Sequence, residues 1–143
     1  MKKLASAFLL FVLAASVAVG SATAFGADAA MNAFWEKFKA AVIKGDKETV
    51  AALSAFPLSM GYGMSSIKNK TQFMKSYRDI FAHETNAAKC FQMAKPAIDK
   101  KRPKEFTVSC PFAKDSGGDE PFVYTFKLTR NVWRFVGFEN INE

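Results

Sequence analysis

The strongest constraint on the fold is a regular alternation of apolar and polar residues in the last third of the chain. Phe106, Val108, Cys110 and Phe112 alternate with polar or small residues, and residues 122–129 repeat the pattern. A period of two is typical of strands that bury one face and expose the other. Residues 132–138 form a third apolar segment, reached through a tight turn at 130–131, where asparagine tolerates a positive φ. The pattern predicts an antiparallel sheet.

The region before the sheet carries apolar residues at helical spacing. One stripe predicts a first helix that ends at Gly45. Asp46 then suits the N-cap of a short second helix, because its carboxylate can accept the N–H of Thr49, and Pro57 is expected to end that helix. The first stripe consists of Met31, Phe34, Trp35, Phe38, Ala41 and Val42.

A third helix is predicted after residue 69, with Asn69 or Thr71 as its cap. Leu58 to Ile67 resembles a small hairpin that turns at its glycines. Residues 85–104 are the least regular: we expect a helical turn over 87–90, a strand over 91–98 interrupted by Pro96, and a basic loop over 100–104. The stripe of the third helix is Phe73, Met74, Tyr77, Ile80 and Phe81.

The first 24 residues are typical of a cleavable secretory signal peptide. Lys2 and Lys3 precede an uncharged apolar segment over 4–19, which is short for a membrane span. Ala22-Thr23-Ala24 supplies small residues at the cleavage site, and Ala27-Asp28-Ala29 is a second candidate. The sequence therefore predicts a signal peptide at 1–24 and a single periplasmic or secreted domain at 25–143, without a membrane anchor after cleavage.

Two properties of the predicted mature chain limit its partners. Its 18 basic and 13 acidic residues leave a net charge of +5, which favours anionic partners in general but is weak evidence for nucleic acid, and we expect none. Its two cysteines, Cys90 and Cys110, predict a disulfide in an oxidising compartment. They form no C-x-x-C redox motif, and with the one histidine they are too few for a metal site, so no metal or cofactor is expected.

The predicted order of helix, short helix, hairpin, helix and sheet is that of an α+β roll, with helices packed on one face of a curved antiparallel sheet. The chain resembles the nuclear transport factor 2-like superfamily, a cone-shaped α+β fold related to the cystatin-like roll. The local likenesses are Gly45-Asp46-Lys47, Phe56-Pro57-Leu58, Ile67-Lys68-Asn69 and Trp133-Arg134-Phe135-Val136-Gly137. The resemblance implies a cavity between the first helices and the sheet. It does not imply one activity, because the fold serves isomerases, dehydratases, hydrolases and adaptors.

The resemblance also supplies a test for catalysis. Ketosteroid-isomerase-like members place a carboxylate base in the strand after the second helix and a hydroxyl donor on the first helix. Here the matching segment, 58–62, contains no acid, and Trp35 and Phe38 occupy the pocket-facing stripe of the first helix. Because a general base must lie within hydrogen-bond reach of its proton, that mechanism is not carried over. No catalytic residue is predicted.

The remaining candidate residues are a histidine and three aromatic side chains. His83 lies near Asp79 and Glu84, but it has no accompanying nucleophile and suits the C-terminus of a helix. Trp35, Tyr62 and Tyr124 have apolar bodies with polar tips, which is typical of pocket walls, so we predict them as ligand-binding residues.

Three functions follow as hypotheses. The first is a non-catalytic periplasmic interaction domain that binds a small hydrophobic ligand or forms a homodimer through the outer sheet face. The second is an isomerase, dehydratase or hydrolase acting on a small apolar substrate in the cone. The third is an inhibitor or envelope-interaction protein that uses its basic surface. The missing carboxylate base favours the first over the second.

Overall fold

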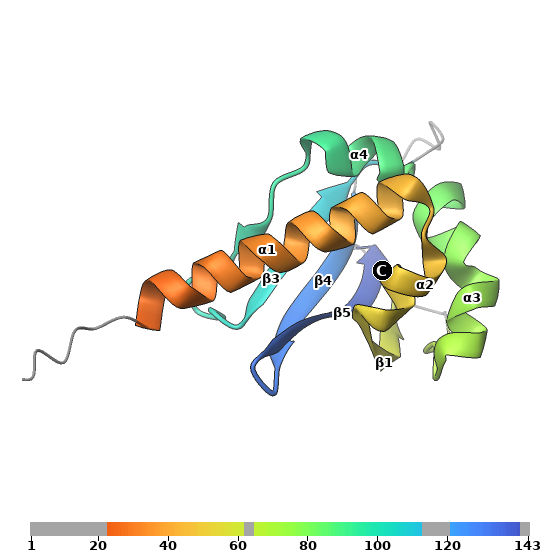
Figure 1. Ribbon diagram of the computed structural model, residues 1–143. Coiled ribbons are helices and arrows are strands. Elements are labelled where there is room, and N and C mark those ends of the chain that lie inside the picture. Colours follow the sequence, from red (N-terminus) through yellow and green to blue (C-terminus); the bar gives the residue numbers. More distant parts are fainter. Residues whose placement is uncertain (1–22, 62–64, 113–120, 141–143) are drawn as a thin grey trace, which may run out of the picture.

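The computed structural model describes residues 23–61, 65–112 and 121–140, and their side chains from residue 28 onward. A long helix begins the described chain, and three antiparallel strands end it (Figure 1). The elements are α1 (Thr23–Lys44), α2 (Lys47–Ala52), β1 (Ser54–Met60), α3 (Lys70–Arg78), the π-helical turn Asp79–His83, α4 (Ala87–Met93), β2 (Ala97–Ile98), β3 (Glu105–Cys110), β4 (Phe122–Thr129) and β5 (Val132–Asn140).

The strands form one sheet in the order β1-β5-β4-β3-β2. The three predicted antiparallel strands are confirmed as β3, β4 and β5, and Arg130 and Asn131 form their turn with φ values of 51° and 63°. The sheet is mixed and not wholly antiparallel, because β1 pairs in parallel with β5. A parallel partner leaves no mark in the local alternation of residues, since it is brought in by a crossover connection.

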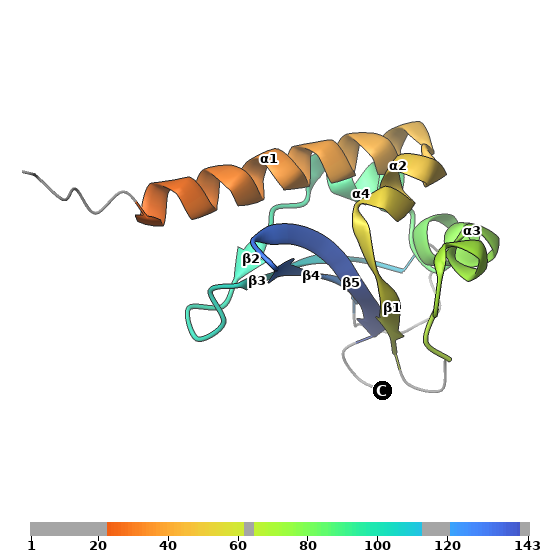
Figure 2. The same cartoon turned by 60° about the horizontal axis from the view of Figure 1, so that its bottom comes forward.

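The helices lie on one face of the curved sheet (Figure 2). α1 crosses that face with α2 and α4 beside it, and α3 covers one end. Along β3 and β4 the buried residues Phe106, Val108, Tyr124 and Phe126 point toward the helices, and the residues between them point to the opposite face. The predicted fold class, helices on one face of a curved sheet, is therefore confirmed.

The helix starts follow the predicted caps. Asp46 accepts the N–H of Thr49 at 3.0 Å and begins α2. Asn69, and not Thr71, caps α3 by accepting the N–H of Gln72 at 3.0 Å. The helix continues into the turn Asp79–His83, so that the stripe from residue 73 to 81 reaches the core as expected.

One prediction about the middle of the chain is wrong, and another is confirmed only in part. Pro57 does not end the second helix: α2 ends at Ala52, and Pro57 lies within β1. The Leu53 carbonyl leaves the helix to accept the N–H of Phe135 at 3.0 Å, so pairing with β5 decides where the helix stops. Leu58 and Ile67, the ends of the expected hairpin, form an antiparallel bridge, and residues 62–64 of its turn lie outside the described part.

The segment 85–104 also differs from expectation. The predicted turn over 87–90 extends to Met93, and the strand expected over 91–98 is limited to Ala97–Ile98. Phe91 stays helical because its ring packs between Trp35 and Tyr124, with centroid distances of 5.0 Å to each. Tertiary burial thus overrides the local strand propensity here.

The predicted disulfide is confirmed. Cys90 on α4 is bonded to Cys110 at the end of β3, with a Cα–Cα distance of 5.8 Å. The bond ties the last helix to the sheet, and it is compatible with an extracytoplasmic location. The predicted signal peptide falls almost wholly on residues outside the described part, so it stays a prediction. Within the described residues no helix is long and apolar enough to cross a bilayer.

Candidate interaction surface

The interior of the cone is packed with aromatic rings. The six rings at its centre are no more than 3% exposed, and neighbouring rings lie 4.9–6.3 Å apart. Rings at these distances in stacked, tilted and edge-on orientations form a dense apolar core. The six are Phe38, Phe81, Phe91, Tyr124, Phe126 and Phe135.

Tyr124 brings a polar group into this core. Its hydroxyl donates to the Ile80 carbonyl at 2.7 Å and accepts from the Thr85 hydroxyl at 2.5 Å. Both partners are buried, so the three groups satisfy one another. Burial raises the pKa of Tyr124 well above its usual range. A neutral phenol whose hydrogen bonds are already made is a structural group, without a free proton to transfer.

The predicted ligand-binding residues are placed as follows. Trp35 is 3% exposed and packs edge-on against Phe91, and Tyr124 is fully buried. Neither lines either of the two hollows described below. Tyr62 lies outside the described residues. Their role as ligand contacts stays a prediction, and it would require rings of the core to move apart.

The larger hollow lies on the opposite face of the sheet, which no described helix covers. It has a volume of about 670 Å³, and its lining includes residues of β1, β3, β4 and β5. Strand register arranges the lining in three rows across the strands. The first is Glu105 and Lys127, the middle one Thr107, Thr125, Gly137 and Ser59, and the third Ser109, Val123 and Glu139.

The side chains of the middle row rise little above the sheet because its residues are small. Gly137 faces Ser59 across the parallel β1–β5 pair, where an added Cβ would lie 3.2 Å from both the Cβ and the carbonyl oxygen of Ser59. Glycine therefore allows β1 to approach β5 closely, and it leaves no side chain above the strand. We call this outward surface, defined by the three rows, the outer hollow.

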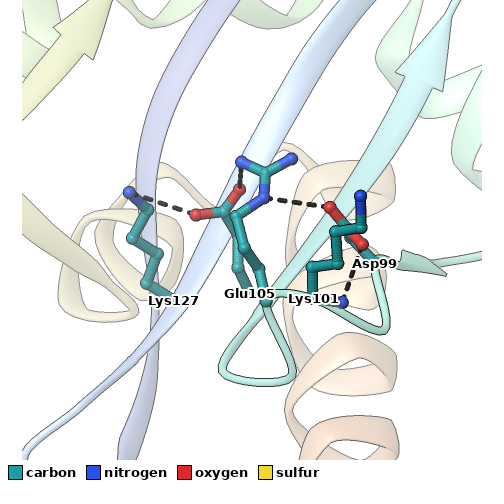
Figure 3. Close-up of polar contacts among 5 residues, drawn as sticks. Asp99, Lys101, Glu105 and Lys127 are labelled. Carbon is teal, nitrogen blue, oxygen red and sulfur yellow. Dashed lines mark hydrogen bonds and ion pairs between the residues drawn. The ribbon is translucent and has the colours of Figure 1, made fainter.

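The charged side chains of Arg102, Glu105 and Lys127 border the outer hollow at one end. Figure 3 shows the polar contacts in which they take part. Glu105, only 13% exposed, accepts from Arg102 Nη1 at 2.5 Å and pairs with Lys127 Nζ at 3.1 Å. Arg102 Nε also donates to Asp99 at 3.2 Å, and Asp99 accepts the N–H of Lys101 at 2.8 Å. The Lys101 N–H and the Arg102 guanidinium lower the pKa of the Asp99 carboxyl. These contacts fix the turn before β3.

A second hollow of about 460 Å³ lies between α4 and the end of β3. Its lining includes Cys90, Phe112 and Met93, which is 80% exposed. Phe112 is the last described residue before the gap at 113–120.

His83 and the carboxylates near it form no catalytic cluster. His83 lies at the end of the π-helical turn, where half of its side chain is exposed and its Nδ1 is 3.4 Å from Glu84. Among the described residues no group of three or more histidine, cysteine or carboxylate side chains could hold a metal ion.

Sequence reasoning missed the outer hollow. It named the outer sheet face as a possible dimer surface but no residues on it, although the small side chains of threonine and serine at 107, 109 and 125 were a signal of low relief there. The three rows depend on the register of four strands, including the parallel partner β1, and a local pattern does not contain that register.

No family model matches the chain, and no curated protein matches it. Solved structures that resemble it include proteins described as having nuclear transport factor 2-like or cystatin-like folds and proteins described as enzymes. A Nostoc punctiforme protein of unknown function with a cystatin-like fold is 14% identical over 79% of this chain and 88% of its own, with a TM-score of 0.45.

Two further structures are similar at the same level. A nuclear transport factor 2-like protein from Novosphingobium aromaticivorans is 15% identical over 81% of each chain, with a TM-score of 0.43. A structure described as a ketosteroid isomerase from Shewanella frigidimarina is 10% identical over 80% of this chain and 97% of its own, with a TM-score of 0.46. These likenesses agree with the family that the sequence resembles, and no argument about function rests on them.

Proposed function

We propose that the protein is a non-catalytic interaction domain of the cell envelope that acts through the outer hollow and forms a homodimer there. The observation that carries the proposal is the contrast between the two faces of the sheet. The helix-covered face is closed by buried rings with its central hydroxyl already satisfied, whereas the opposite face carries a hollow of about 670 Å³. A ligand or partner needs accessible surface, and this face carries the larger of the two hollows described above.

The charges of the outer hollow suit a second copy of the same chain. Lys127 and Glu139 stand on opposite sides of the middle row, two residues from it along their strands. A two-fold axis lying along that row would place the Lys127 row of one copy over the Glu139 row of the other. Such an isologous contact is self-complementary, because each pairing occurs twice. The small residues of the middle row would let the two sheets approach to about 10 Å.

The test is the oligomeric state measured by analytical ultracentrifugation. Thr125→Arg places a long cation in the middle row and should turn a dimer into a monomer. Thr71→Arg makes the same change on the exposed face of α3 and should leave the dimer intact. Added salt should weaken the association, because the charged side chains that would pair between the two copies lie near the protein surface. A wild-type protein that stays monomeric at high concentration contradicts the proposed dimer.

A second measurement separates this proposal from binding in the cone. Small hydrophobic molecules should not quench Trp35 in a saturable way, since the ring is enclosed by the core. Saturable quenching of the wild type that is abolished by Trp35→Leu would instead favour a ligand in the cone, and product analysis of the same mixtures would then decide between binding and turnover.

A further inference from the structure

We propose that one end of the molecule docks on an anionic phospholipid bilayer. This surface, which we call the basic end, consists of the turn from Asp99 to Lys104, the turn Arg130-Asn131, and the adjoining residues Ile98, Glu105, Lys127 and Val132. The inference goes beyond the proposed dimer, because it concerns the end of the sheet and a different kind of partner.

The two turns lie at the same end because of strand register. Glu105, the first residue of β3, pairs with Lys127 near the end of β4, and the β4–β5 turn follows three residues later. In both views of the fold, the two turns and the start of α1 lie at one end, and α3 lies at the other (Figures 1 and 2).

The basic end carries unbalanced positive charge. It has six cations and two acids, and both acids are already engaged: Asp99 pairs with Arg102, and Glu105 pairs with Arg102 and Lys127. Four cations remain exposed and form no ion pair with any other described residue. These are Lys100, Lys101, Lys104 and Arg130. The network fixes the turn that carries three of them, so little order has to be gained on binding.

Exposed aliphatic side chains accompany this charge. Ile98 is 43% exposed before the first turn, and Val132 is 47% exposed after the second. Large apolar side chains with this exposure are few in the described part of the chain, where the others are Ile43 and Met93. Cations next to exposed aliphatic groups suit the headgroup region of a bilayer, which offers anionic phosphates and acyl chains together. A dissolved polyanion offers only the charge.

The position of the predicted apolar segment gives a second reason to propose a bilayer as the partner. α1 starts at the basic end with Thr23, four residues after Val19, the last residue of the predicted apolar segment. Four residues span at most about 14 Å. While that segment is in the membrane, the start of α1 would therefore lie no more than about 14 Å from the segment's outer end. After cleavage, the same surface is positioned to stay on the membrane without an anchor.

Vesicle sedimentation of the processed protein tests the proposal, with its N-terminus verified by mass spectrometry. Wild type should bind vesicles that contain phosphatidylglycerol and should not bind pure phosphatidylcholine. Each cation near an anionic surface is worth about fivefold in affinity, so K100Q/K101Q/K104Q should bind about a hundredfold more weakly. The matched control, K68Q/K75Q/R78Q, removes the same charge from the opposite end and should bind like wild type.

Two further comparisons distinguish the bilayer from other anions. Val132→Ser should weaken vesicle binding severalfold at constant charge, and soluble polyphosphate at the same phosphate concentration should compete poorly. No vesicle binding by wild type, or equal losses in the two triple variants, would overturn the proposal. So would an unaffected Val132→Ser variant together with tight polyphosphate binding, because the surface would then recognise anions alone. The dimer is measured separately in solution, so its failure and the failure of this proposal are distinguishable.

Discussion

Phe126 occupies the point where the first helix meets the sheet. Its ring is fully buried, and it contacts the rings of Phe38 at 4.9 Å and Phe106 at 4.5 Å. The next residue, Lys127, points to the outer face and makes only a surface ion pair with Glu105. Neighbouring residues on one strand thus have opposite energetic roles, as the alternation of strand faces requires.

This difference predicts the effect of two neighbouring substitutions on stability. Phe126→Ala should lower the free energy of unfolding by about 3–5 kcal/mol, because it removes a buried ring and leaves a cavity. Lys127→Ala should cost no more than about 1 kcal/mol, the usual value of an exposed ion pair. Chemical denaturation of both variants measures this. Similar losses in the two variants would mean that the assigned strand faces are inverted.

The two buried tyrosines make a second matched pair. The Tyr124 hydroxyl bonds to Thr85 and to the Ile80 carbonyl, whereas the Tyr77 hydroxyl has no hydrogen-bond partner among the described residues. Tyr124→Phe should therefore cost about 1–3 kcal/mol at neutral pH, because it leaves buried polar groups unpaired. Tyr77→Phe should be neutral or slightly stabilising. A larger loss in Tyr77→Phe than in Tyr124→Phe would contradict these hydrogen bonds.

At the scale of elements, the disulfide holds α4 against the sheet. It joins residues 20 apart in the sequence, from a helix of seven residues to the end of β3. α4 is short, so its position depends on this bond and on the burial of Phe91 more than on helix propensity.

Removing the bond should weaken this attachment. C90A/C110A should lower the free energy of unfolding by about 3 kcal/mol, the chain-entropy value for a loop of this size. Alanine is chosen because Cys110 is fully buried, where a serine hydroxyl would need a partner. Denaturation of the variant should match that of reduced wild type. If the oxidised wild type and the variant unfold at the same denaturant concentration, the bond does not stabilise the fold.

At the scale of the whole molecule, the predicted signal peptide ends where the long first helix begins. The predicted cleavage after Ala24 lies within the first turn of α1, which begins at Thr23. Among the side chains that the structure describes from residue 28 onward, the first of α1 to enter the core is that of Met31.

We expect export with cleavage after Ala24. Mass spectrometry of the protein from an envelope fraction should give a mature N-terminus at Phe25. A mature N-terminus at Ala30 would move the cleavage to the second candidate site and still leave Met31 in place. An intact Met1 would contradict export by a cleavable signal peptide.

Stability of the whole molecule should also fall at alkaline pH. Burial raises the pKa of Tyr77 to about 12, with a smaller contribution from the charge of Asp46, and it raises the pKa of Tyr124 further. Below pH 10 both phenols are neutral in the folded and unfolded chains. Above pH 10 only the unfolded chain releases these protons, so stability declines by about 1.4 kcal/mol per pH unit for each tyrosine. Tyr77→Phe should reduce that slope between pH 10 and 12.

The sequence by itself determined the elements whose signal is local. Alternation over residues 106–138 defined three antiparallel strands and their buried face, and helical spacing defined the stripes of α1 and α3. Asp46 and Asn69 marked helix starts because a cap acts within three residues of itself. The disulfide followed from the even number of cysteines and from the predicted oxidising compartment.

Only the tertiary structure decided the features that depend on distant partners. The parallel pairing of β1 with β5 could not be read locally because β5 lies about eighty residues away, and Phe91 remained helical because its ring is buried in the core. Trp35 and Tyr124 have the composition of pocket residues, but packing put them inside a filled core. The outer hollow and the basic end likewise depend on register and on which ends of the strands meet. Residue type sets what a side chain can do, and its neighbours in space set whether it is free to do it.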